Sequence, residues 1–209
     1  MDELFTVGHS NHDIERFLDL LEANGITAIC DVRSSPYSRH NPQFNRELLQ
    51  ASLKKRNIAY VFLGKELGPR SDDPGCYVDG KVQYSRLAAS ENFRSGMERL
   101  KAGMKRYRIA MMCAEKDPIG CHRMILICRA LRGEPVAIHH ILESGSIEDL
   151  RSSEQRLLIE LKLPQLRLFE NPEDLIQRAY DTQSERIAFV REDEPQGSEI
   201  TQKREPWTN

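Results

Sequence analysis

The chain has 209 residues, which is enough for one large domain or for a domain of ordinary size with an appendage. Hydrophobic residues make up 39% and charged residues 30%, as in globular proteins, and a formal net charge of −2 argues against a generally basic, nucleic-acid-coating surface. We expect a cytoplasmic protein without membrane contact, because the first residues lack a secretory pattern and no apolar run is long enough to cross a bilayer. The five cysteines are an odd number and predict reduced thiols.

Apolar runs of strand character alternate along the chain with amphipathic segments of helical spacing. The predicted strands cover residues 4–7, 27–33, 59–63, 108–113 and 135–141. The predicted helices between them cover residues 14–21, 46–55, 85–104 and 118–132. Residues 64–81 are rich in Gly, Pro and Asp and predict a long loop of the kind that often forms a lid or a binding site. The alternation predicts an α/β fold with a doubly wound, mostly parallel five-stranded sheet of the Rossmann or flavodoxin type.

The composition becomes polar and helix-forming after residue 142, with predicted helices over residues 147–162 and 172–180. We therefore expect an α/β domain over residues 1–142 and a helical C-terminal extension over residues 143–190. The remaining residues, 191–209, are polar and contain proline, which predicts a flexible tail.

Side chains that a hydrophobic core would reject stand at the ends of three predicted strands. They are His9 and Ser10, Asp31 and Arg33, and Cys113 and Glu115. The ends of parallel strands with right-handed crossovers meet at one edge of the sheet, where open α/β sheets usually bind ligands. We therefore expect residues 8–10, 31–35 and 113–115 to line one pocket. The alternatives are a structural ion pair between Asp31 and Arg33 and a turn in which the backbone holds His9.

A predicted helix follows the fourth strand, with Asp117 as its N-cap and Pro118 in its first turn. Cys121 shares a helical face with apolar residues and is expected to pack in the core. His122 and Arg123 project to other faces, where Arg123 would favour an anion at the helix N-terminus. A solvated surface is the alternative for both side chains.

Cys113, Cys121 and His122 are three potential zinc ligands within a short stretch. Structural zinc sites usually combine paired ligands about two to four residues apart with a second such pair, and this chain has no second cysteine pair. Glycine-rich nucleotide-binding fingerprints are missing as well. We therefore predict neither a metal nor another cofactor.

Six short motifs together are similar to one known family. They are TVGHS over residues 6–10, DVR over 31–33, LGKELG over 63–68, MCAE over 112–115, CHR over 121–123 and HHI over 139–141. Their combination and order resemble the domain of unknown function 488 family over about residues 4–142. The resemblance implies an intracellular α/β domain in which these motifs group as a signature; it implies a site rather than a reaction.

The residues favour a hydrolase or group transferase that acts on a small anionic, phosphate-bearing or nucleotide-like substrate. The predicted catalytic residues are Glu115, Cys113, His9 and Asp31, and the predicted substrate-binding residues are Ser10, Arg33, His122 and Arg123. Glu115 is expected to be a partly buried general base or nucleophile, while Arg33 and Arg123 hold the anion. Cys113 is either a nucleophile activated by the helix dipole and His9 or a polarizable wall beside Glu115. N-glycosidic cleavage is one candidate reaction.

Two alternative functions belong to other classes. A non-catalytic module would bind nucleic acid or a partner protein through the basic residues 54–56 and 105–108. These clusters also follow predicted helices, whose C-termini favour cations. A thiol-based redox sensor would use Cys113 and Cys121.

Overall fold

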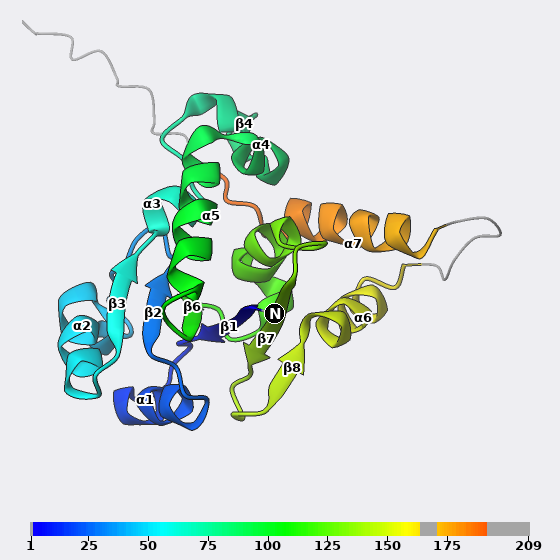
Figure 1. Cartoon of the computed structure of the whole chain (residues 1–209). Coiled ribbons are helices and arrows are strands. Elements are labelled where there is room, and N and C mark those ends of the chain that lie inside the picture. The colour runs from blue at the N-terminus through cyan, green and yellow to red at the C-terminus, as the bar shows by residue number, and fades with distance from the viewer. Residues whose placement is uncertain (1, 164–170, 192–209) are drawn as a thin grey trace, which may run out of the picture.

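A six-stranded sheet forms the centre of the protein, of which the computed structural model describes residues 2–163 and 171–191 (Figure 1). Its strands are β1 (Asp2–Gly8), β2 (Ala28–Asp31), β3 (Ala59–Phe62), β6 (Ile109–Cys113), β7 (Val136–Ile141) and β8 (Ile147–Asp149). Across the sheet their order is β3-β2-β6-β1-β7-β8. The first five strands of this order pair in parallel, and β8 is antiparallel to β7.

Helices cover both faces of the sheet, which confirms the predicted doubly wound α/β fold (Figure 1). On one face, α1 (Ile14–Ala23) and α2 (Arg46–Lys55) pack through a core that includes Leu21 and Leu49. The other face carries α5 (Glu91–Met104), the π-helix η4 (Arg123–Cys128), α6 (Leu150–Glu160) and α7 (Pro172–Ile187).

Strand β6 is buried along its whole length because it lies inside the sheet with helices on both sides. Its side chains alternate between the two faces. Met111 and Cys113 belong to the core on the α5 side, whereas Ala110 and Met112 belong to the core on the α1 side. This alternation places the sulfur of Cys113 on the same face as η4.

The sheet has one strand more than predicted. Residues 147–149, expected to begin a helix, form the edge strand β8 instead. Helix α6 begins after Asp149, whose carboxylate accepts a hydrogen bond from the amide of Ser152 at 2.9 Å. So short a strand has no periodicity of its own, and its residues fit the helical spacing that follows them. Helix α7 continues to Ile187, beyond its predicted end.

Two predicted helices differ from the structure. The helix expected over residues 85–104 is divided into α4 (Tyr84–Ala89) and α5, because the hydroxyl of Ser90 caps α5 at the amide of Phe93. The helix expected over residues 118–132 is a 3₁₀ turn, η3 (Pro118–Gly120), followed by η4. All six residues of η4 are buried, so an assignment of faces from α-helical periodicity fails there.

The segment predicted as a long loop contains short elements of its own. They are α3 (Gly64–Leu67), the 3₁₀ turn η2 (Pro74–Cys76), and a hairpin of β4 (Tyr77–Val78) and β5 (Lys81–Val82). Residues 189–191 lie beside the hairpin: the amide of Val82 donates to the carbonyl of Phe189 at 2.9 Å, and the amide of Arg191 donates to the carbonyl of Gly80 at 2.8 Å. The hairpin therefore contacts the chain directly after α7.

The C-terminal extension shares its core with the sheet. Leu157 of α6 and Tyr180 of α7 belong to the same buried cluster as Met111. The predicted domain division at residue 142 stays a prediction, and the predicted tail lies outside the described residues except for Arg191. Within the described ranges, no helix combines the length and the apolar character needed to cross a membrane.

Candidate active site at the carboxyl edge of the sheet

A cavity of about 370 Å³ opens at the carboxyl edge of the sheet, where β1, β6 and β2 lie side by side. Its lining includes His9, Ser10, Arg33, Ser35, Tyr37 and Ala114, so it draws on all three predicted segments. The chain leaves β1 toward α1 on one face and leaves β6 toward η4 on the other, and ligand-binding crevices form where neighbouring connections diverge in this way. We call this cavity the edge pocket.

The ends of β1 and β6 are joined beyond their last paired residues. The amide of His9 donates to the carbonyl of Cys113 at 2.9 Å, and the amide of Ser10 donates to the carbonyl of Ala114 at 3.0 Å. Ser10 has a positive φ of 47°, a conformation that residues other than glycine seldom adopt and that is concentrated at functional sites. The backbone thus holds Ser10 at the pocket wall in a strained state.

Asp31 and Arg33 form the buried ion pair that sequence analysis gave as an alternative. Arg33 donates through Nε to Oδ1 of Asp31 at 2.9 Å and through Nη2 to Oδ2 at 2.6 Å. The hydroxyl of Tyr60 also donates to Oδ2, at 2.9 Å. Asp31 is fully buried and its oxygens are occupied, so it fixes the orientation of Arg33 rather than facing the edge pocket.

His9 is held as a neutral imidazole. Its Nε2 lies 3.2 Å from Nη1 of Arg33, and a guanidinium can only donate, so Nε2 accepts and the proton lies on Nδ1. Nδ1 donates to the carbonyl of Ser10 at 2.9 Å. Burial lowers the pKa of His9 to about 4; the hydrogen bond to Ser10 opposes this shift and the charge of Arg33 reinforces it.

A second polar cluster consists of Cys113, Cys121 and His122, and Cys113 directly precedes Ala114 of the edge-pocket lining. All three side chains are buried. Burial disfavours ionisation of Cys121, but the neighbouring thiol of Cys113 and the charge of Arg123 hold its pKa well below the ordinary value. The interaction with Cys121, together with burial, raises the pKa of Cys113. Cys121 thus packs in the core, as predicted, but beside polar groups.

Arg123 is fully buried, in contrast to both positions expected for it. It donates to the carbonyls of Glu115 at 2.5 Å and Lys116 at 2.9 Å, and to the hydroxyl of Thr6 at 3.3 Å. Among the described residues, no carboxylate forms an ion pair with Arg123; its partners are two carbonyls and one hydroxyl. Its donors hold the turn after β6, and Arg123 does not line the edge pocket.

The side chain of Glu115 is exposed, so the expectation of a partly buried carboxylate is wrong. Its backbone faces inward, where the carbonyl receives the hydrogen bond from Arg123. The edge pocket is lined by the neighbouring Ala114 and not by Glu115. The catalytic role assigned to Glu115 stays a prediction.

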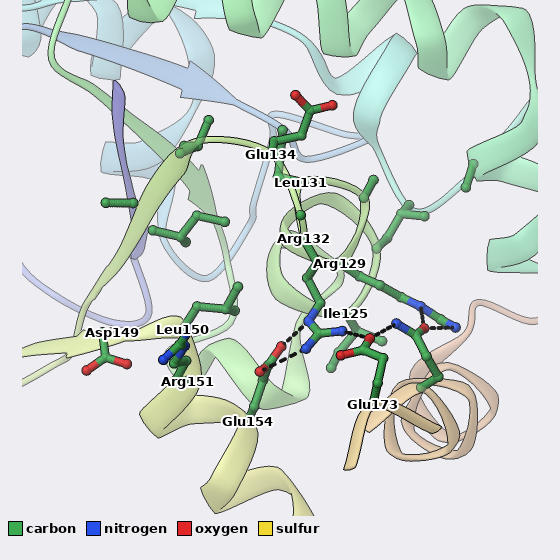
Figure 2. A pocket seen from close by; sticks show the side chains of 18 of the residues that line it. Ile125, Arg129, Leu131, Arg132, Glu134, Asp149, Leu150, Arg151, Glu154 and Glu173 are labelled. Carbon is green, nitrogen blue, oxygen red and sulfur yellow. Dashed lines mark hydrogen bonds and ion pairs between the residues drawn. The ribbon is translucent and has the colours of Figure 1, made fainter. Parts of the chain in front are cut away.

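A larger cavity, of about 960 Å³, lies elsewhere, at the amino end of β7 (Figure 2). Figure 2 shows Arg132 between Glu154 and Glu173, with which it forms ion pairs. Arg129 is paired in the same way, with Asp181 of α7. These charges hold α6 and α7 against the end of η4, so the smaller edge pocket is the better candidate for chemistry.

Both basic clusters contain residues that are already paired. Arg56 forms ion pairs with Glu15 and Glu22 of α1, and Arg108 pairs with Glu3. These contacts support the simpler explanation of the clusters as solvated helix ends.

The fold and the site define a class, that of α/β proteins with a doubly wound sheet and a polar pocket at its carboxyl edge. A family model, domain of unknown function DUF488, matches residues 13–130, and the chain belongs to this family. The match confirms the resemblance; it contains the DVR, CAE and CHR motifs but begins after His9 and ends before His139. No curated protein and no solved structure matches the chain.

Proposed function

We propose that the protein is a hydrolase or group transferase that binds a small anionic, phosphate-bearing or nucleotide-like molecule in the edge pocket. One observation carries the proposal: Nη1 of Arg33 and Nε2 of His9 lie 3.2 Å apart in the lining of this pocket, at the ends of two different strands. A cation and an imidazole at a crevice of this kind suit an anionic ligand that takes part in proton transfer. We also propose a cytoplasmic location, which the five free thiols support.

Arg33 is suited to bind an anion because its orientation is fixed before the ligand arrives. Of its five N–H groups, two donate to Asp31, one to the carbonyl of Phe44 and one to His9. The remaining Nη1 hydrogen is available to a ligand. A cation whose rotamer is locked by an ion pair loses little entropy on binding.

His9 supplies the proton chemistry in this proposal. An anion that binds Nη1 of Arg33 places negative charge beside the imidazole and competes for the donor that now occupies Nε2. Both changes raise the pKa of His9 from its low value, so the imidazole can accept a proton in the bound complex. In the complexes whose imidazole is still neutral, His9 removes a proton from an attacking water or hydroxyl and delivers it to the leaving group.

The test is calorimetric titration of the protein with inorganic phosphate, a nucleoside monophosphate and the matching uncharged nucleoside. We expect binding of the two phosphates and not of the nucleoside. At pH 6, titrations in buffers of different ionisation enthalpy should show proton uptake by the parent. His9→Gln should lose that uptake, whereas His40→Gln, which changes an exposed imidazole outside the edge pocket, should keep it.

Equal proton uptake by the parent and His9→Gln would overturn the role of His9, and absence of phosphate binding would overturn the proposal. Glu115→Gln separates the two acid–base candidates. We expect it to fold and bind like the parent, since the side chain is exposed. Loss of turnover of a bound phosphate ester with binding retained would assign proton transfer to Glu115 instead.

A further inference from the structure

The second polar cluster has the geometry of a metal site. Sγ of Cys113, Sγ of Cys121 and one ring nitrogen of His122 all lie within 4.8 Å of one another. Nδ1 of His122 is 3.6 Å from Sγ of Cys113 and 3.7 Å from Sγ of Cys121. A metal ion about 2.3 Å from a thiolate and about 2.0 Å from an imidazole separates such ligand atoms by about 3.5–4.0 Å in tetrahedral or trigonal geometry. The two measured sulfur–nitrogen distances fall within that range.

A backbone carbonyl orients the imidazole of His122, as it does for many metal-bound histidines. Its Nε2 lies 2.9 Å from the carbonyl oxygen of Val32, which can only accept, so Nε2 carries the proton. In the neutral imidazole with this tautomer the lone pair is on Nδ1, the nitrogen that lies near both sulfurs. A metal-bound histidine usually donates its other N–H to a carbonyl or carboxylate in this way.

Fold topology brings the three ligands together although their spacing along the chain is unlike that of a zinc motif. Cys113 ends β6, while Cys121 and His122 lie between η3 and η4. The spacing of ligands along the chain predicts no metal here, because it does not reveal that the chain returns onto the same face of the sheet.

We propose that Cys113, Cys121 and His122 bind one thiophilic metal ion, Zn²⁺ or Cu⁺. Soft thiolate ligands select these two ions, and binding releases the protons of both thiols to solvent. No other histidine, cysteine or carboxylate joins the group among the described residues. Zn²⁺ would therefore keep one open position, whereas three ligands suit Cu⁺. Two thiolates with Cu⁺ carry one net negative charge, which balances the neighbouring Arg123.

A bound ion would fix Cys113, the residue directly before Ala114 of the edge-pocket lining. It would join the end of β6 to the start of η4, and the hydrogen bond from His122 to Val32 extends the connection to β2. The carbonyl of Cys113 already receives the amide of His9. The site is thus joined to the proposed acid–base group by one backbone hydrogen bond and does not depend on what the edge pocket binds.

The experiment uses the full chain, reduced and freed of metal by a chelator, without oxygen. It is titrated with Zn²⁺ and, separately, with Cu⁺, each against a chromophoric competitor for the same ion. We expect one ion per folded chain and a higher melting temperature in its presence. The ion that binds at one per chain and depends on all three ligands is the one the site accepts. Phosphate binding is measured independently, so failure of either proposal is distinguishable from failure of the other.

Variants locate the site. Cys113→Ser, Cys121→Ser and His122→Gln should each weaken binding by more than the roughly 10–100-fold that loss of an outer-shell partner costs. Cys128→Ser is the matched control, because this thiol is equally buried on η4 but lies outside the group, and it should bind like the parent.

X-ray absorption of the metal-loaded parent keeps the proposal testable where a variant fails to fold. We expect two sulfur atoms and one nitrogen around the ion, with sulfur at about 2.3 Å for Zn²⁺. A shell without sulfur, absence of stoichiometric binding, or equal loss of binding in Cys128→Ser would overturn the proposal. A Cys113–Cys121 disulfide formed in air by a protein that binds neither ion when reduced would overturn it too, in favour of a redox pair.

Discussion

Replacement of Gly8 by alanine is expected to destabilise the protein, because the end of β1 lies against backbone. A Cβ at this position would overlap the carbonyl group of Glu115, only 2.8 Å from its carbon, and would lie 2.9 Å from Cα of Lys116. Real Cβ atoms do not approach other atoms so closely, so either β1 or the backbone of residues 115–116 would have to move. The obstacle is main chain, and Arg123 holds it by donating to the carbonyls of Glu115 and Lys116.

The size of the effect follows from these contacts. Forcing a methyl group into a packed site costs ~1–3 kcal/mol. Moving the turn far enough to admit the methyl also weakens hydrogen bonds from a charged donor, each of which contributes ~1.5–3 kcal/mol. We expect the free energy of unfolding to fall by about 3–5 kcal/mol, which is large for one substitution.

Urea unfolding followed by circular dichroism measures this loss. Gly120→Ala is the matched control, because Gly120 lies in the adjacent turn η3 and a Cβ there meets nothing within 4 Å. The control should stay within about 0.5 kcal/mol of the parent. If Gly8→Ala unfolds at the same urea concentration and with the same slope as Gly120→Ala, the close approach that we infer between β1 and the 115–116 turn does not exist.

Three further predictions concern buried polar groups and a helix cap. The free energy of unfolding should fall as the pH is lowered from 6.5 to 4, because unfolded histidines bind protons there while burial keeps the pKa of His9 at about 4 and that of His140 at about 3. His9 accounts for about 3 kcal/mol of this loss; urea midpoints of His9→Gln should depend less on pH in that window, and an unchanged dependence would contradict the assignment. Arg123→Lys should lower the free energy of unfolding, measured in urea, by about 3 kcal/mol or more, since one ammonium cannot reach two carbonyls and a hydroxyl at once. Near-parental stability would show that these hydrogen bonds are dispensable. Ser90→Ala should cost ~1 kcal/mol through the lost cap of α5, and an unchanged melting temperature would mean that the cap is not formed in solution.

The parallel sheet and the position of its edge pocket were predictable from the sequence because both follow from the order of strands and helices. Polar residues such as His9 and Arg33 stand out after apolar runs, and topology alone brings the ends of parallel strands together. The pocket residues Tyr37, Ser38 and Asn41 were missed, since they come from the irregular connection after β2 and have no periodicity or motif to mark them.

The roles of Glu115 and Arg123 were not predictable, because both depend on local backbone geometry. The turn after β6 directs the carbonyl of Glu115 inward and its carboxylate outward. The π-helical turn brings Arg123 into the core, where α-helical spacing would have placed it on another face. A main-chain partner such as the carbonyl of Val32, which orients His122, leaves no trace in residue types.

The contact between the β4–β5 hairpin and residues 189–191 couples the opening of two distant stretches of chain. The amides of Val82 and Arg191 donate across this one contact, so exposure of either to solvent requires the same separation. The two amides should therefore exchange hydrogen with similar opening free energies, as one cooperative unit. The segment before the hairpin also contacts the chain after β2, where the amide of Arg70 donates to the hydroxyl of Ser34 at 3.1 Å; the neighbours Arg33 and Ser35 line the edge pocket. The segment that contacts the chain after β2 therefore leads directly into a hairpin that the chain joins again only after α7.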